Sequence, residues 1–159
     1  MEYNKMLKKN CLESRILKKI SCKKREVFIR ADFEDISSDY DQIGRALKKL
    51  VQKGILIRVG YGLYTKAMKS SISDKVIPRI GMNELGKQCL KRLFVSVSST
   101  VEEEEYNKGL STQFPTGRVI GIKGRFSRKI TINGISLVFE KAQALKRNLD
   151  AKKYKIQPY

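Results

Sequence analysis

The chain has 159 residues, 41% of them hydrophobic, which is enough for one ordinary domain or two small ones with packed cores. Its 34 Lys and Arg against 16 Asp and Glu give a formal charge of +18, and this excess favours a polyanionic partner such as nucleic acid. The chain has no histidine, the usual general base and commonest metal ligand, and its three cysteines lack a Cys-x-x-Cys spacing, so neither a zinc site nor a disulfide framework is expected.

We therefore predict a protein that is not an enzyme and that binds no metal or cofactor. The acidic run Glu102–Glu105 would spread around a helix, so we expect it to be solvated rather than to hold Mg²⁺. No apolar run is long enough to span a membrane, and the polar, basic first residues do not resemble a secretory signal. The expectation is a soluble, cytoplasmic protein without membrane contact.

Two helical segments are predicted at the start of the chain. Residues 11–22 carry apolar side chains on one side and basic ones on the other, so this helix should pack beneath a longer one. Ala31–Ile36 should then form one or two helical turns. Ser37 and Ser38 follow as a tight turn.

A longer helix is predicted from Asp39 to Lys53, with Ser38 as its N-cap and Gly54 as the left-handed residue that ends it. Its apolar residues recur at i, i+3, i+4, i+7 and i+8, the spacing of one buried stripe. These residues are Ile43, Ala46, Leu47, Leu50 and Val51. The polar and mostly basic residues of this helix would then face solvent.

A β-hairpin is predicted directly afterwards, because Ile55–Val59 and Leu63–Lys66 are rich in β-branched and aromatic residues and flank the tip Gly60-Tyr61-Gly62. Short helix, turn, helix and hairpin in this order are the plan of a winged helix-turn-helix, a DNA-reading module. A basic helix alone is more often merely solvated, but here three independent features agree.

The polar, serine-rich segment Met68–Lys75 is the predicted domain boundary, between a winged helix-turn-helix domain at residues 1–70 and a partner-binding domain at residues 76–159. Asn133-Gly134 is a strong hairpin signal in the second domain. The other elements predicted there are helices Asn83–Phe94 and Thr100–Lys108, strands Arg118–Lys123, Arg128–Ile132 and Ile135–Phe139, and a basic helix Lys141–Lys153. The fold class is therefore α+β, with a small helix-plus-antiparallel-sheet domain after the winged helix-turn-helix.

Nine residues are predicted to contact DNA. Near the start of the long helix, Gln42 suits adenine, Arg45 suits guanine, and the ring of Tyr40 suits a thymine methyl group. Tyr40 also borders the apolar stripe, so core packing is the alternative for it. Lys48, Lys49, Arg58 and Lys66 suit phosphate contacts, and Tyr61 suits the backbone or the edge of the minor groove. The full set is Ser38, Tyr40, Gln42, Arg45, Lys48, Lys49, Arg58, Tyr61 and Lys66.

The sequence also resembles a known family. The residues that carry the resemblance are Ile16–Ile20, Val27-Phe28, Asp32-Phe33, Arg45-Ala46-Leu47, Leu50, Lys53-Gly54 and Arg58–Tyr64, followed more loosely by Tyr106–Gly117 and Ser127–Ile130. They are similar to those of AbiEi-type antitoxins, the winged-helix transcriptional regulators of type IV toxin–antitoxin systems.

This resemblance implies a sequence-specific repressor that binds double-stranded DNA at its own operator and autoregulates its operon. It further implies that the C-terminal region counters a cognate, nucleotidyltransferase-like toxin. A symmetric homodimer on inverted half-sites is also expected. The alternative is an interaction protein that neutralises a partner and contacts nucleic acid without sequence preference.

Overall fold

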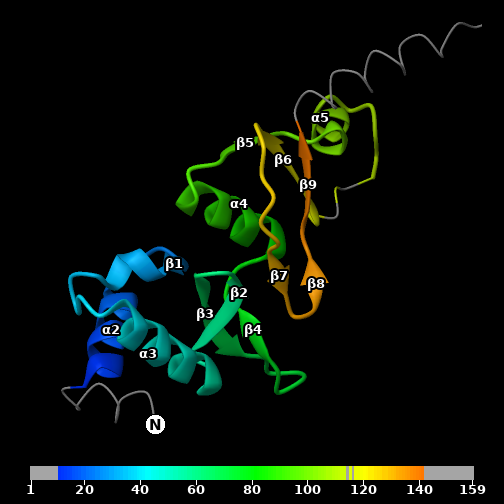
Figure 1. Ribbon diagram of the computed structural model, residues 1–159. Coiled ribbons are helices and arrows are strands. Elements are labelled where there is room, and N and C mark those ends of the chain that lie inside the picture. The colour runs from blue at the N-terminus through cyan, green and yellow to red at the C-terminus, as the bar shows by residue number, and fades with distance from the viewer. Residues whose placement is uncertain (1–10, 114, 116, 142–159) are drawn as a thin grey trace, which may run out of the picture. The chain divides into compact units, whose positions relative to one another are not determined.

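The computed structural model describes residues 11–113, 115 and 117–141, and the chain divides into two compact units between Gly81 and Met82 (Figure 1). Each unit combines helices with a small sheet. The predicted α+β fold class is therefore confirmed. Within the described ranges, no helix has both the length and the apolar composition needed to cross a membrane.

Among its described residues, 11–81, the first unit has two α-helices, a 3-10 turn and a sheet. Its elements are α2 (Leu12–Cys22), β1 (Val27–Ile29), the 3-10 turn η1 (Arg30–Phe33), α3 (Tyr40–Gln52), β2 (Leu56–Gly60), β3 (Leu63–Lys69) and β4 (Val76–Pro78). The central strand β3 pairs with β1 and β2 on its two sides, and its last residues pair with β4; all three pairings are antiparallel.

The stripe predicted on the long helix forms the core of this unit. Its first four members are fully or almost fully buried, and Val51 packs partly buried against them. They pack with apolar residues of α2, β1, η1 and the hairpin, namely Ile16, Ile20, Phe28, Phe33, Leu56 and Tyr64. Because one side of α3 is sealed in this way, its opposite side must face solvent.

The start of α3 differs by one residue from the prediction. Asp39, not Ser38, caps the helix: its Oδ1 accepts hydrogen bonds from the backbone N–H groups of Asp41 at 2.9 Å and Gln42 at 3.0 Å. The hydroxyl of Ser37 accepts from the Asp39 N–H at 3.2 Å, so the serines shape the turn and leave the cap to the next residue. The hydrogen bond from the Gln42 N–H is the main reason that the pKa of Asp39 lies below its usual value.

The end of α3 confirms the prediction for Gly54, which has a φ of 69°. The N–H of Gly54 bonds to the carbonyl of Val51 at 2.9 Å and that of Ile55 to the carbonyl of Leu50 at 3.0 Å, which is a Schellman motif. The chain then enters the predicted hairpin. Gly62, with a φ of 68°, supplies the left-handed residue of its tip.

The predicted boundary at Met68–Lys75 is wrong. Met68 pairs with Ile77, and Lys69 pairs with Val76, so this segment connects β3 to β4 inside the first unit. Polar and serine-rich composition is shared by linkers and by turns between strands, and composition alone does not separate them.

The second unit contains two helices and five strands among its described residues. They are α4 (Met82–Arg92), β5 (Ser96–Ser98), α5 (Val101–Asn107), β6 (Val119–Lys123), β7 (Thr131–Ile132), β8 (Ile135–Ser136) and β9 (Val138–Lys141). The predicted hairpin is present between β7 and β8. Asn133 and Gly134 have φ angles of 50° and 84°, as a tight hairpin turn with two left-handed residues requires.

The antiparallel sheet predicted for this unit needs one correction. Strand β6 pairs antiparallel with β5 but parallel with β9. The β7–β8 hairpin lies in the connection between β6 and β9, so the chain returns to the end from which β6 started. The predicted basic helix lies outside the described residues except for Lys141, which is the last residue of β9.

Candidate nucleic-acid interface

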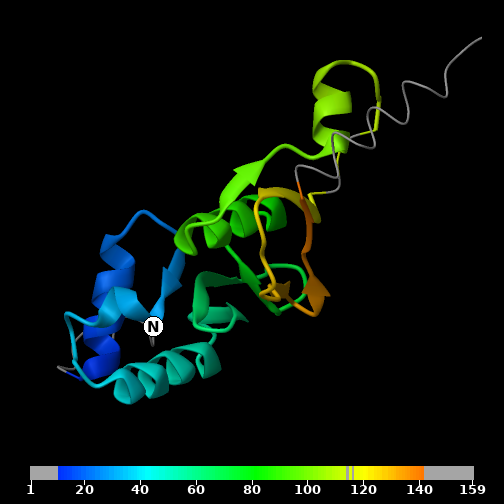
Figure 2. The same ribbon diagram turned by 45° about the horizontal axis from the view of Figure 1, so that its top comes forward.

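The solvent side of α3 is a basic helical surface of the first unit. We define the α3 face as its six exposed polar residues, Asp41, Gln42, Arg45, Lys48, Lys49 and Gln52. Three of them are cationic and one is anionic. Figure 2 shows α3 running along one edge of its unit, with a long side turned away from the strands. Four predicted base or phosphate contacts therefore share one accessible surface: Gln42, Arg45, Lys48 and Lys49.

A carboxylate of α2 neutralises the C-terminal end of this surface. Glu13 forms ion pairs with Lys49 at 2.9 Å and Lys53 at 3.1 Å. The hydrogen bond from Lys49 is the largest effect on the pKa of Glu13, and together with Lys53 it outweighs burial and lowers that pKa. Arg45 and Lys48 form no ion pair with any residue in the described part of the chain. The positive charge available to a ligand is therefore concentrated at these two residues.

Tyr40, at the first position of α3, lies outside the core. It is 49% exposed, whereas the first four stripe residues of the same helix are almost fully buried, so core packing does not describe its role. One face of its ring is covered by Arg30, whose Cζ lies 4.3 Å from the ring centroid. The sequence prediction missed Arg30. Gly44 could have indicated it, because a glycine inside a helix often marks a close approach.

The hairpin contributes two of the three side chains predicted from it. Arg58 is exposed, and its Nε donates to the carbonyl of Gly60 at 3.3 Å. Tyr61 is 76% exposed at the turn between β2 and β3. Both are accessible to a ligand of the first unit.

The prediction that Lys66 contacts phosphate is wrong. Its residue is only 9% exposed, its Nζ donates to the carbonyl of Lys23 at 2.6 Å, and it lies 3.8 Å from Glu26. It also lies over the ring of Phe28 at 5.8 Å. Each of these contacts is internal to the fold, because the other elements of the unit cover this part of β3. Lys66 is therefore a structural lysine.

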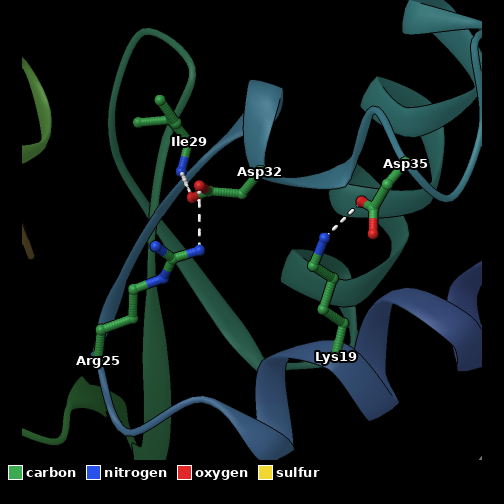
Figure 3. A network of polar contacts seen from close by, with 5 residues as sticks. All are labelled: Lys19, Arg25, Ile29, Asp32 and Asp35. Carbon is green, nitrogen blue, oxygen red and sulfur yellow. Dashed lines mark hydrogen bonds and ion pairs between the residues drawn. The ribbon is translucent and has the colours of Figure 1, made fainter.

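A polar network fixes the segment that leads into α3 (Figure 3). Asp32 of η1 accepts a hydrogen bond from the backbone N–H of Ile29 at 2.8 Å and pairs with Arg25 at 3.0 Å. Two residues beyond η1, Asp35 pairs with Lys19 of α2. The Asp32 side chain is only 9% exposed, so its bonds are shielded from water. These contacts tie η1 and the following turn to β1 and α2.

The described residues contain no group of three or more His, Cys, Asp or Glu side chains that could hold a metal ion. A protein-family model matches residues 15–157, and its description is a family of unknown function, DUF6088. The match extends over both units. No curated protein and no solved structure matches the chain.

Proposed function

The chain belongs to the DUF6088 family, and we propose that it is a sequence-specific DNA-binding transcriptional repressor whose first unit acts as a winged helix-turn-helix. The observation that carries the proposal is the α3 face. It is an exposed helical surface whose Arg45 and Lys48 form no ion pair with a described residue. The helix is followed directly by a hairpin with exposed Arg58 and Tyr61. The element order α2, β1, η1, α3, β2 and β3 supports it, because a helix, a tight turn, a second helix and a hairpin are the parts of that module.

The proposed division of labour follows the chemistry of each side chain. Gln42 and Arg45 lie in the first half of α3, the part of a recognition helix that meets base edges in the major groove. Lys48 would contact phosphate, which fixes the register on the duplex without reading sequence. Arg58 and Tyr61 would meet the backbone or the minor groove edge beside the helix.

We extend the proposal to the antitoxin role that the AbiEi-type resemblance implies. The second unit would bind a nucleotidyltransferase-like toxin, and the repressor would act as a homodimer on inverted half-sites. Exposed apolar side chains support a partner for this unit, because large exposed apolar residues are common at protein interfaces. Phe94 is 94% and Leu110 75% exposed. The alternative is a partner-neutralising protein that holds nucleic acid without sequence preference.

The test begins with selection of duplexes from a random-sequence pool by the full chain, followed by comparison of the consensus with the DNA upstream of its own gene. Arg45→Ala should then relax preference at one base pair, at a cost of about 1–3 kcal/mol, because a bidentate base contact is lost. Lys48→Ala should weaken all duplexes alike and flatten the salt dependence.

Arg15→Ala is the matched control, because Arg15 is an exposed arginine on α2, outside the α3 face, and forms no ion pair with a described residue. It should leave base preference unchanged. Failure of the pool to yield a consensus would reject sequence-specific binding and favour the alternative.

A further inference from the structure

The guanidinium of Arg30, the first residue of η1, lies against the surface of α3 at Gly44. This close approach is possible because residue 44 has no side chain. A Cβ at Gly44 would lie 2.8 Å from Nη2 and 3.0 Å from Cζ of Arg30, distances shorter than ordinary van der Waals contact. Any larger side chain at this position would push the guanidinium away. Glycine is a poor helix former, so its presence inside α3 is explained by this close approach rather than by local preference.

This contact between Arg30 and α3 lies beside the α3 face. Tyr40, Gly44 and Lys48 follow each other at i, i+4 and i+8, so they form one strip along the flank of the helix. Arg30 lies against the middle of this strip and covers one face of the Tyr40 ring. Its Nε is buried without a hydrogen bond to any described residue. The stacking on Tyr40, the fit at Gly44 and the interactions with the side chains of Tyr40 and Tyr64 hold the guanidinium.

Two tyrosines surround this guanidinium. Tyr64 is buried in β3, and Tyr40 is half exposed at the start of α3. Burial is the largest single effect on the pKa of Arg30 and would lower it, but the interactions with Tyr40 and Tyr64 together raise that pKa. The contact thus joins η1, α3 and β3 at the end of the helix where base edges would be met.

We propose that Arg30 is a positioning residue for DNA readout, which holds the Tyr40 ring in one orientation so that its uncovered side meets a base in the major groove, a thymine methyl group by its chemistry. The inference rests on the proposed function. A planar cation stacked on an aromatic ring restricts the rotation of that ring, and an arginine does this better than a lysine. The role differs from a phosphate contact because Arg30 acts through Tyr40.

The main experiment is a double-mutant cycle on the full chain. Its measure is the ratio of affinities for the selected consensus duplex and a scrambled duplex. Arg30→Ala and Tyr40→Ala should each lower this ratio by about five- to tenfold, and the double variant should lower it no further. Arg30→Lys keeps the charge but loses the planar stack, so the ratio should fall while the salt dependence stays unchanged.

Gly44→Ala is a second, independent variant. The added methyl group should displace Arg30 and lower the ratio as Arg30→Ala does, without lowering the unfolding temperature, because alanine favours the helix. Gly81→Ala is the matched control, since a Cβ there meets nothing within 4 Å. It should leave the ratio unchanged.

Three results would overturn the positioning role. The first is equal weakening of consensus and scrambled duplexes by Arg30→Ala, with a flatter salt dependence, which would make Arg30 a phosphate contact. The second is an additive loss in the double variant. The third is an unchanged ratio of consensus to scrambled affinity in Arg30→Ala or Gly44→Ala, when the wild type does prefer its consensus. A wild type without any consensus would instead remove the proposed function itself.

Discussion

The two units carry almost the same excess of charge but arrange it differently. Residues 1–81 hold 19 Lys and Arg against 9 Asp and Glu, and residues 82–159 hold 15 against 7. In the first unit, cations gather on the solvent side of α3, opposite its buried stripe. In the second unit, the described helix α5 carries the acidic run Glu102–Glu105. Net charge therefore does not identify a binding surface; the packing that selects which charges share a face does.

The largest expected effect comes from separating the units between Gly81 and Met82. Both fragments are basic, so both should bind random-sequence duplex DNA at low salt through counterion release. At physiological salt, residues 1–81 alone should keep a preference of at least about a hundredfold for the consensus, because base contacts persist there. Electrophoretic mobility shifts with consensus and scrambled duplexes measure this. Preference in residues 82–159 instead would reverse the assignment of the two units.

The second effect concerns the polar network of Asp32 and Asp35 in the segment that precedes α3 in the chain. Asp32→Ala leaves the Ile29 N–H and Arg25 without their acceptor in a shielded site, so the free energy of unfolding should fall by about 1–3 kcal/mol. Denaturant unfolding of the full chain measures the loss. Asp35→Ala is the control from the same network: its pair with Lys19 is exposed, and its effect should be much smaller. Equal losses would show that shielding does not distinguish the two carboxylates.

A third, smaller effect should follow from releasing Lys49 and Lys53. Glu13→Gln removes the carboxylate that pairs with both, so affinity for random duplex should rise by about three- to tenfold at low salt, with a steeper salt dependence. The measurement is the observed affinity as a function of salt concentration.

Glu34→Gln supplies the charge-matched control for Glu13→Gln. Glu34 is exposed and forms no ion pair with a described residue, so this variant adds the same charge without releasing a lysine. Identical salt dependence in the two variants would mean that net charge, and not the freed lysines, causes the increase.

The smallest effect tests the cap of α3. Asp39→Ala should lower the unfolding temperature at neutral pH, whereas Ser38→Ala should not, because only Asp39 bonds to the helix N–H groups. The pKa of Asp39 is lowered in the folded chain, so its stabilisation is present above the usual aspartate range and is lost as the pH falls through the folded pKa. The difference between wild type and Asp39→Ala should therefore shrink as the pH is lowered below the usual aspartate range. A larger effect of Ser38→Ala would restore Ser38 as the cap.

Strongly periodic segments were predictable, and the shortest elements were not. The apolar spacing of α3 determined both its extent and its exposed face, and Asn133-Gly134 determined a hairpin. Strands β1, β4 and β5 each have three residues, too few for a period to be recognised. The predicted strand Arg128–Ile132 contracts to β7, and Ile135–Phe139 divides into β8 and β9 at Leu137. Local propensity does not set these limits because pairing with distant strands does.

The sequence by itself therefore determined the α+β class, the buried and exposed sides of α3 and the basic excess of both halves, because each of these depends on composition or on neighbours a few residues apart. Tertiary structure alone decided which cations of the first unit are available. Glu13 pairs with Lys49 of α3 and with Lys53 at its C-terminal cap, Lys66 is buried, and Arg30 lies against Gly44. Each of these contacts joins segments that are distant along the chain, and only the packed fold brings their atoms within reach of one another.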